Sequence, residues 1–310
     1  MESSVTIGTR GSQLALWQAN WIKDRLETLH PGIRVALEII KTKGDKITDV
    51  PLAKVGGKGL FVKEIEQALI EGHVDIAVHS MKDMPAEIPA DLCIGAVPER
   101  ETPMDVLIAR NGLSLNKLGQ NPRIGTSSLR RAAQLRHARP DAVIVPLRGN
   151  LDTRLRKLVE EQLDAIVLAA AGVKRLGLAD RITEILKPEV MLPAVGQGAL
   201  CVEIRTADPV ITPLMAPLDH WPTRQAVLAE RAFLARLEGG CQVPIAGHAI
   251  LDGDHLSMTG LVADLDGRTM VRHTWGGPAG SAKAIGLALA ERLLEQGAGA
   301  ILDSLQTEIH

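Results

Sequence analysis

Strand-like and helix-like segments alternate through the first half of this chain, and this order sharply limits the folds it can adopt. Apolar, strand-like runs at 5–8, 34–40 and 75–79 alternate with amphipathic helix patterns at 12–29 and 60–70. A second series has strand patterns at 105–109, 123–126, 142–146 and 164–169 around helix patterns at 127–138 and 151–161. Such alternation predicts parallel sheets in two similar α/β units, with ligands bound beyond the carboxyl ends of the strands.

The pattern changes after Pro217 and Pro222. A helix pattern at 223–237 leads into three β-patterned segments, at 245–251, 255–263 and 268–275, and a last helix pattern spans 282–296. Short strands in direct succession favour antiparallel pairing, so this part predicts a small α+β domain with an antiparallel sheet. Proline-bounded segments at 98–103 and 193–198 are the expected crossings between the two α/β units.

Positive charge is concentrated in the middle of the chain. The net charge of all 310 residues is -2, but residues 121–181 hold ten Arg and two Lys against six acidic residues, and residues 219–310 are acidic. Arginine outnumbers lysine by 22 to 13, and arginine suits bidentate binding of carboxylates and phosphates. A solvated helix face is the alternative explanation. Because several of these arginines follow strands or glycine-rich turns, we expect an anionic ligand instead.

Composition excludes several other classes of protein. Two Phe, four Trp and no Tyr offer few surfaces for base stacking, and the overall charge is not that of a nucleic-acid binder. Three cysteines without CxxC pairs predict neither a disulfide framework nor a zinc site, and fit a reducing cytoplasm. We expect no secretory signal at the N-terminus and no membrane span, since no apolar stretch is long enough.

One candidate site lies at the end of the strand pattern 75–79. Ser80, Lys82 and Asp83 follow it directly, and Pro85 ends the segment. A carboxylate beside a lysine can stay ionised, stabilise a cation or take up a proton. A plain strand-to-turn connection, with Asp83 as a cap, is the simpler alternative.

A second candidate site follows the strand pattern at 123–126. Thr126, Ser127 and Ser128 open a helix pattern, and Arg130 and Arg131 lie within its first turn. Hydroxyls and free N–H groups at a helix N-terminus attract anions, and the arginines add charge. The same combination recurs at other junctions, in Arg10, Ser12, Arg148, Arg154 and Arg175.

Two further segments have distinctive sequences. Residues 54–61 form a glycine-rich basic loop that contains Lys54, Lys58 and Phe61, which we interpret as a lid, with a long connector as the alternative. Cys241 follows two glycines between a helix and a strand pattern, so its thiol is a candidate for covalent anchoring of an anionic group. Cys93 and Cys201 lie within apolar strand patterns and are expected to be buried and inert.

Four motifs together resemble those of the porphobilinogen deaminase family, whose members are also called hydroxymethylbilane synthases. They are HSMKDMP at 79–85, GTSSLRR at 125–131, LRGN at 147–150 and LEGGCQVP at 237–244. The resemblance extends from Arg10 through PAVGQG at 193–198 to the last helix pattern. It departs from the family at Gln13, where many members have proline, and at Met84, where valine is common.

The resemblance implies a fold and its domain limits. The expected architecture is two periplasmic-binding-protein-like α/β domains and a small α+β C-terminal domain with an antiparallel sheet. Domain 1 would comprise 1–98 and 199–216, domain 2 would comprise 104–192, and domain 3 would comprise 221–310.

The resemblance also implies an activity. Family members condense four porphobilinogen molecules head to tail, with loss of ammonia, on a dipyrromethane cofactor, and release hydroxymethylbilane by hydrolysis. By this resemblance Cys241 carries the cofactor through a thioether, and Asp83 is the catalytic carboxylate that stabilises cationic pyrrole states and moves protons. No metal is required.

Other positions of the chain match family residues that contact the cofactor, the substrate or the loop over the site. Positions that bind carboxylate groups are Arg10, Ser12, Lys82, Thr126, Ser128, Arg130, Arg131, Arg148, Arg154 and Arg175. Lys54, Lys58 and Phe61 match the mobile loop, Gln197 matches the segment between domains, and Ser80 and Ser127 belong to the motifs themselves.

We further expect a cytoplasmic monomer that passes hydroxymethylbilane to the next enzyme, without nucleic-acid or membrane partners. Two alternatives stay open at this point. A two-lobed binding protein for a small carboxylate or phosphate would explain the arginines, but it would leave Cys241 without a role. A nucleic-acid-binding regulator would need a helix-turn-helix or another basic nucleic-acid-binding element, and the C-terminal part is acidic.

Overall fold

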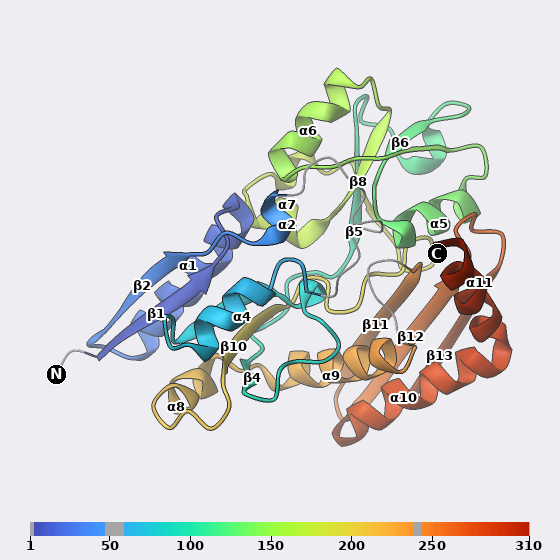
Figure 1. Ribbon diagram of the computed structural model, residues 1–310. Coiled ribbons are helices and arrows are strands. Elements are labelled where there is room, and N and C mark those ends of the chain that lie inside the picture. The colour runs from blue at the N-terminus through green and yellow to red at the C-terminus, as the bar shows by residue number, and fades with distance from the viewer. Residues whose placement is uncertain (1–2, 47–58, 238–242, 310) are drawn as a thin grey trace. The chain divides into compact units, whose positions relative to one another are not determined.

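The computed structural model describes residues 3–46, 59–237 and 243–309 (Figure 1). The chain forms two compact units. Among the described residues, the first comprises 3–46, 59–101 and 198–224, and the second comprises 102–197, 225–237 and 243–309.

A five-stranded sheet forms the centre of the first unit. Its strand order is β2-β1-β3-β10-β4, with β1 at Ser3–Thr9, β2 at Ile33–Ile39, β3 at Ile76–Ser80, β4 at Leu92–Ala96 and β10 at Leu200–Arg205. β1 pairs in parallel with β2 and β3, whereas β10 runs antiparallel to both β3 and β4. The prediction of a parallel sheet was therefore wrong for β10. This strand lies more than a hundred residues after β3 and β4 in the chain and is inserted between them.

Two helices cover opposite faces of this sheet. Helix α1 (Gln13–Leu29) buries Ile22 and Leu26 in a cluster that includes Ile76 and Val78 of β3. Helix α4 (Lys63–Ile70) packs in another cluster with Ala77 of the same strand. Successive side chains of a strand point to opposite faces. Ile76 and Val78 therefore pack in one cluster, and Ala77 packs in the other. Two shorter helices, α2 (Lys43–Lys46) and α8 (Ile211–Met215), complete the unit.

The second unit contains a five-stranded sheet of the same design. Its order is β7-β6-β8-β5-β9, with β5 at Asp105–Ala109, β6 at Arg123–Gly125, β7 at Val143–Val145, β8 at Ala165–Ala169 and β9 at Glu184–Leu186. β6 pairs in parallel with β7 and β8, and β5 is antiparallel to β8 and β9. Its helices are α5 (Leu129–Ala138), α6 (Leu151–Glu160) and α7 (Ala170–Arg175). Two similar α/β halves are thus confirmed, each with a mixed sheet.

A three-stranded antiparallel sheet belongs to the C-terminal part of the second unit, as the sequence predicts. It consists of β11 (Ile245–Asp252), β12 (His255–Ala263) and β13 (Met270–Pro278). Phe233 of α9 (Trp221–Arg236) is fully buried in a cluster with Met258 and with Leu289 of α10 (Ala282–Leu293). The predicted limits of domains 2 and 3 remain a prediction, because residues 102–197 and the described residues after 224 belong to one unit.

The last helical segment differs from the single helix that the sequence predicts. α10 is followed by a π-helical turn at Leu294–Ala298 and then by α11 (Gly299–Ile309). Gly297 has a φ of +101°, which helical residues cannot adopt, so the helix is broken there. Among the described residues, no helix is both long and apolar enough to cross a membrane.

The close packing of α10 on α9 yields a prediction. A Cβ on Gly286 would lie 2.1 Å from the backbone oxygen of Ala229, whereas a Cβ on Gly280 would meet no atom within 4 Å. Since backbone cannot move aside cheaply, Gly286→Ala is expected to lower the free energy of unfolding by about 1–3 kcal/mol. Gly280→Ala is the matched control in urea denaturation, and equal stability of the two variants would contradict this packing.

Candidate active site

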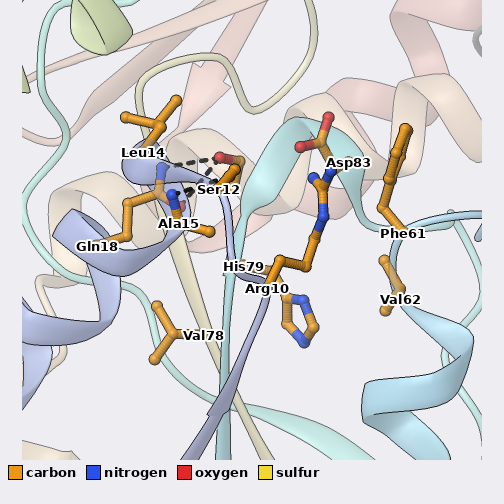
Figure 2. A pocket seen from close by; sticks show the side chains of 11 residues that line it. Arg10, Ser12, Leu14, Ala15, Gln18, Phe61, Val62, Val78, His79 and Asp83 are labelled. Atoms are coloured by element: carbon orange, nitrogen blue, oxygen red, sulfur yellow. Dashed lines mark hydrogen bonds between the residues drawn. The ribbon is translucent and has the colours of Figure 1, made fainter. Parts of the chain in front are cut away.

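A pocket lies where β1 and β3 of the first unit end. Arg10 follows β1, Ser12 precedes α1, Ser80 ends β3, and Asp83 lies in the 3-10 turn Met81–Asp83 (Figure 2). All four line the pocket, together with Leu14, Ala15, Gln18, Phe61, Val62, Val78 and His79. The structure therefore brings together residues from segments that are widely separated in the sequence.

The start of α1 gives the pocket a helix N-terminus. Ser12 is the N-cap, and its Oγ accepts a hydrogen bond from the Ala15 amide at 3.3 Å. The first turn of α1 contains no acidic residue, so the positive end of its dipole is not compensated there. One turn further, the Gln18 amide Nε2 donates to Ser80 Oγ at 2.9 Å and fixes that hydroxyl. This wall of the pocket favours an anionic group.

Arg10 is held between a carboxylate and an aromatic ring. Its Nε donates to Asp45 Oδ1 at 3.1 Å, and its guanidinium carbon lies 4.1 Å from the centroid of the Phe61 ring. Burial alone would raise the pKa of Asp45, but hydrogen bonds from Arg10 and Thr42 outweigh burial and lower that pKa. Asp45 was not predicted as a site residue. The structure places it in the short helix α2 (Lys43–Lys46), which the sequence did not predict.

The turn that carries Asp83 is anchored on both sides. The Met81 amide donates to the Ala199 oxygen at 3.0 Å, directly before β10, and the Met84 amide closes the turn on the Met81 oxygen at 3.2 Å. Asp83 and Lys82 are both half-buried in this turn. Asp83 thus has a defined backbone position in the pocket that Arg10 also lines.

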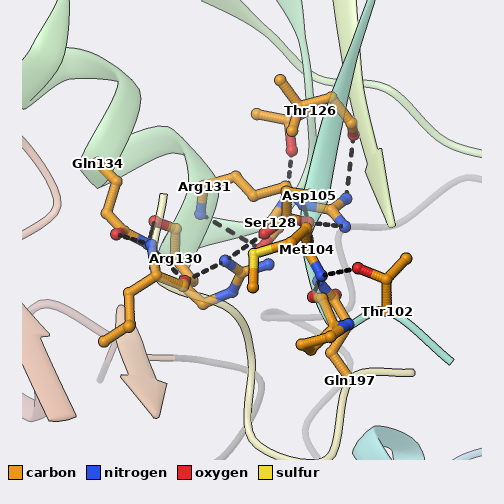
Figure 3. A network of polar contacts seen from close by, with 12 residues as sticks. Thr102, Met104, Asp105, Thr126, Ser128, Arg130, Arg131, Gln134 and Gln197 are labelled. Atoms are coloured by element: carbon orange, nitrogen blue, oxygen red, sulfur yellow. Dashed lines mark hydrogen bonds and ion pairs between the residues drawn. The ribbon is translucent and has the colours of Figure 1, made fainter. Parts of the chain in front are cut away.

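The second candidate set lies in the second unit and centres on Asp105, at the start of β5. Its Oδ2 accepts a hydrogen bond from Arg130 Nη1 at 2.7 Å, and its Oδ1 accepts from Arg131 Nε at 2.9 Å and from Gln197 Nε2 at 3.1 Å (Figure 3). Asp105 is fully buried, and Arg130 and Arg131 are each only 6% exposed. Two buried guanidinium groups therefore share one carboxylate.

Charge and burial act in opposite directions on this cluster. Burial would raise the pKa of Asp105, but the charges of Arg130 and Arg131 and hydrogen bonds from Arg130 and Gln197 lower it to about 2. Burial lowers the pKa of Arg131, and Asp105 opposes this. At neutral pH the three charged groups sum to +1, so the cluster stays positive. Asp105 was not predicted as a site residue, because in the sequence it is the first residue of an ordinary strand pattern.

The hydroxyl groups before α5 are used in different ways. Ser128 is the N-cap and accepts from the Arg131 amide at 3.4 Å, while Thr126 Oγ1 accepts from the Ser128 amide at 3.2 Å. Ser127 Oγ both donates to the Leu147 oxygen and accepts from the Leu147 amide, each at 2.9 Å. In this structure Ser127 joins the loop before α5 to the loop before α6.

The remaining cationic candidates lie at helix ends of the same unit. Arg148 precedes Gly149, whose φ of +111° makes the turn before α6, and Arg154 Nε donates to the Gly149 oxygen at 2.9 Å. Arg175 ends α7, and all three arginines are half-buried. Gln197 Nε2 also donates to the Pro103 oxygen at 2.6 Å.

Three predicted residues fall outside the described part of the chain, namely Lys54, Lys58 and Cys241. Within the described ranges, no group of three or more His, Cys, Asp or Glu side chains could hold a metal ion. Of the other two cysteines, Cys201 is buried in β10 and Cys93 is partly buried in β4.

Each unit thus presents cationic and hydroxyl groups where strands end and helices begin, which defines an α/β protein of the class that binds anions at such positions. Comparison with known proteins specifies the family. The family model for porphobilinogen deaminase, dipyrromethane cofactor binding domain, matches residues 5–212, and the model for its C-terminal domain matches residues 224–295. The chain belongs to the porphobilinogen deaminase family, as the sequence motifs suggest.

Individual relatives agree over nearly the whole length. The porphobilinogen deaminase of Syntrophotalea carbinolica is 58% identical over 98% of this chain and 96% of its own. That of Nitratidesulfovibrio vulgaris strain Hildenborough is 57% identical over 97% of this chain and 96% of its own. Among solved structures, a TRAP periplasmic solute binding protein from Desulfovibrio salexigens aligns with a TM-score of 0.43 at 10% identity, covering 71% of this chain and 73% of that one.

The Asp105 cluster yields a prediction on stability. Asp105→Asn removes the carboxylate that neutralises two buried arginines, so it is expected to lower the free energy of unfolding by about 3 kcal/mol or more. Urea denaturation at neutral pH measures this loss. Asp141→Asn is a matched control, because Asp141 pairs with Arg139 at an exposed site; a loss no larger than in that control would contradict the cluster's role.

The same cluster predicts a pH dependence. The pKa of Asp105 lies at about 2 in the folded protein, below its ordinary value of 3.8, so its contribution to stability is present above about pH 4 and is lost as pH falls toward 2. This contribution amounts to about 2 kcal/mol. Wild-type stability should therefore fall more steeply than that of Asp105→Asn between pH 4 and 2, and parallel pH profiles would contradict the assignment.

Proposed function

We propose that this chain is a hydroxymethylbilane synthase, a transferase that joins four porphobilinogen molecules head to tail with loss of ammonia and releases the linear tetrapyrrole by hydrolysis. The observation that carries the proposal is the 58% identity to a porphobilinogen deaminase over 98% of the chain. The pocket of the first unit supports it, because Asp83 and Arg10 line the same pocket as the N-cap Ser12.

The donor groups of the chain fit a dipyrromethane cofactor and a substrate that both carry carboxylates. Arg10, Ser12 and the N-terminus of α1 suit one carboxylate in the first unit. Ser80 lines the same pocket, and Lys82 lies in the turn that carries Asp83. When bound, the cofactor supplies the free pyrrole α-carbon to which the first substrate unit is joined. Cys241 would attach it through a thioether.

Asp83 acts as the acid–base catalyst and stabilises positive charge in the reaction. Porphobilinogen loses ammonia to give an electron-poor, cationic pyrrole system, and an ionised carboxylate within reach of pyrrole N–H groups lowers the energy of such states. The same carboxylate accepts a proton as the joined α-carbon regains its aromatic form. The anchored turn Met81–Asp83 keeps this carboxylate in place between these steps.

The second unit supplies positive charge for the carboxylates of the growing chain. Arg148, Arg154 and Arg175 are half-buried at helix ends, and Thr126 and Ser128 open α5. Arg130 and Arg131 contribute through the residual +1 charge of their cluster with Asp105. Gln197 supports Asp105, and Ser127 fixes the loop that leads to Arg148. Lys54, Lys58 and Phe61 would form the loop over the site.

The protein would act as a cytoplasmic monomer and pass hydroxymethylbilane to the next enzyme of tetrapyrrole synthesis. Size-exclusion chromatography with light scattering tests the monomeric state.

The assay that tests the function measures porphobilinogen and ammonia together. The purified protein should consume porphobilinogen, release one ammonia for each molecule consumed, and yield one tetrapyrrole for every four. A two-lobed binding protein for small anions would bind porphobilinogen without releasing ammonia. That result would contradict the proposed enzyme and favour the binding protein.

Asp83→Asn tests the catalytic carboxylate. The amide keeps the size of the side chain but cannot take up a proton or carry negative charge, so turnover is expected to fall about 100-fold or more with little change in thermal stability. Asp24→Asn is the matched control, since Asp24 is exposed on α1. Turnover of Asp83→Asn equal to that of the control would remove Asp83 from the mechanism.

A further inference from the structure

Three ionisable side chains are buried where β3, β10 and α4 of the first unit pack together, and the proposed function has used none of them. They are His79 of β3, Glu203 of β10 and Glu66 of α4. His79 Nε2 lies 3.2 Å from Glu203 Oε2, and these two side chains are 4% and 0% exposed. Glu66 is 7% exposed. His79 also lines the pocket that contains Asp83 (Figure 2).

The topology explains why they are buried near one another. β3 and β10 are antiparallel neighbours, with His79 opposite Cys201 and Ala77 opposite Glu203. His79 and Ala77 share one face of β3, and that face is the one on which α4 packs. An ionisable side chain from each of the three elements is therefore buried in one place.

If both glutamates were ionised, this cluster would carry more negative charge than its hydrogen bonds can support. Among the described residues, Glu203 Oε1 and Glu66 Oε1 are buried without a hydrogen-bond partner. Two unprotonated carboxylates with an unpaired oxygen each would be costly to bury, and a proton on one of them removes that cost.

Neighbouring charges indicate which carboxyl holds the proton. Burial raises the pKa of Glu66, and the charge of Glu203 raises it further, while His79 and Lys63 oppose this rise. Among the described residues, Arg10 and Asp83 are the charged side chains that line the pocket together with His79. Glu66 therefore keeps a proton to higher pH than an exposed glutamate.

We propose that Glu66, Glu203 and His79 form a buried proton store that exchanges protons with the pocket through the His79 imidazole. This rests on the proposed function, whose chemistry takes a proton from a pyrrole α-carbon and releases ammonia. When His79 takes up a proton at Nδ1, its Nε2 proton moves to Glu203 Oε2, and the reverse transfer returns it. Only protons move, and no electron donor or acceptor is needed. His79 and the two glutamates are thus positioning residues that support Asp83.

Infrared spectroscopy tests the store without any turnover. At about pH 6, where exposed carboxyl groups are ionised, wild-type protein should show a protonated-carboxyl band that is lost in Glu66→Gln. In Glu203→Gln the band should titrate at lower pH than in wild type, because the charge that raises the pKa of Glu66 is gone. Glu71→Gln, at the exposed end of α4, is the control that retains the wild-type band. Absence of the band from wild type overturns the proposal.

Steady-state kinetics test the link to the pocket. Glu203→Gln should lower kcat about tenfold or more while KM stays within about twofold, and Glu71→Gln should match wild type in both. A Glu203→Gln kcat equal to that of wild type overturns the link. If Glu203→Gln does not fold, Glu66→Gln, which has the shape of a protonated glutamate, takes its place in this assay. If wild type does not consume porphobilinogen, the proposed function fails, whereas the infrared band still decides whether the store exists.

Discussion

Two arginine side chains are held inside the second unit by one carboxylate, Asp105, and the positive character of that unit depends on this contact. An unpaired buried guanidinium would be costly, and Asp105 offsets this cost for both Arg130 and Arg131 because it shares its two oxygens between them. Gln197 Nε2 donates a further hydrogen bond to Asp105, and the backbone oxygens of Leu192 and Val167 accept hydrogen bonds from the two arginines. The cluster therefore fixes β5, α5 and the segment before β10 together and still retains a net positive charge.

Local sequence patterns predicted those parts of the fold that form from neighbouring residues. The alternation of strands and helices in the two α/β halves and the antiparallel C-terminal sheet follow from periodicity. The mixed character of both α/β sheets could not be predicted, because β10 and β5 enter by pairing with strands that are distant in sequence. The break at Gly297 resembles an ordinary helical glycine until its φ is known.

The same distinction applies to the candidate site. Ser80, Lys82 and Asp83 lie on one short segment, and a strand followed by a proline is enough to mark them. Asp105 is far in sequence from both of its arginines, and Glu203 is 124 residues from His79, so no local motif could indicate either contact. Arg130 and Arg131 were recognised as cationic residues at a helix start, but their partner became apparent only when β5 was placed beside β8.

In the proposed reaction, Cys241 would carry the primer that porphobilinogen extends. The mass of the intact, denatured protein, recorded before and after brief incubation with porphobilinogen, tests this most directly, with Cys241→Ser alongside. The wild type should exceed its sequence mass by a two-pyrrole adduct and then gain further pyrrole units in steps, whereas the variant should keep its sequence mass. A wild-type mass that equals the sequence mass both before and after incubation would contradict covalent chain growth on this protein.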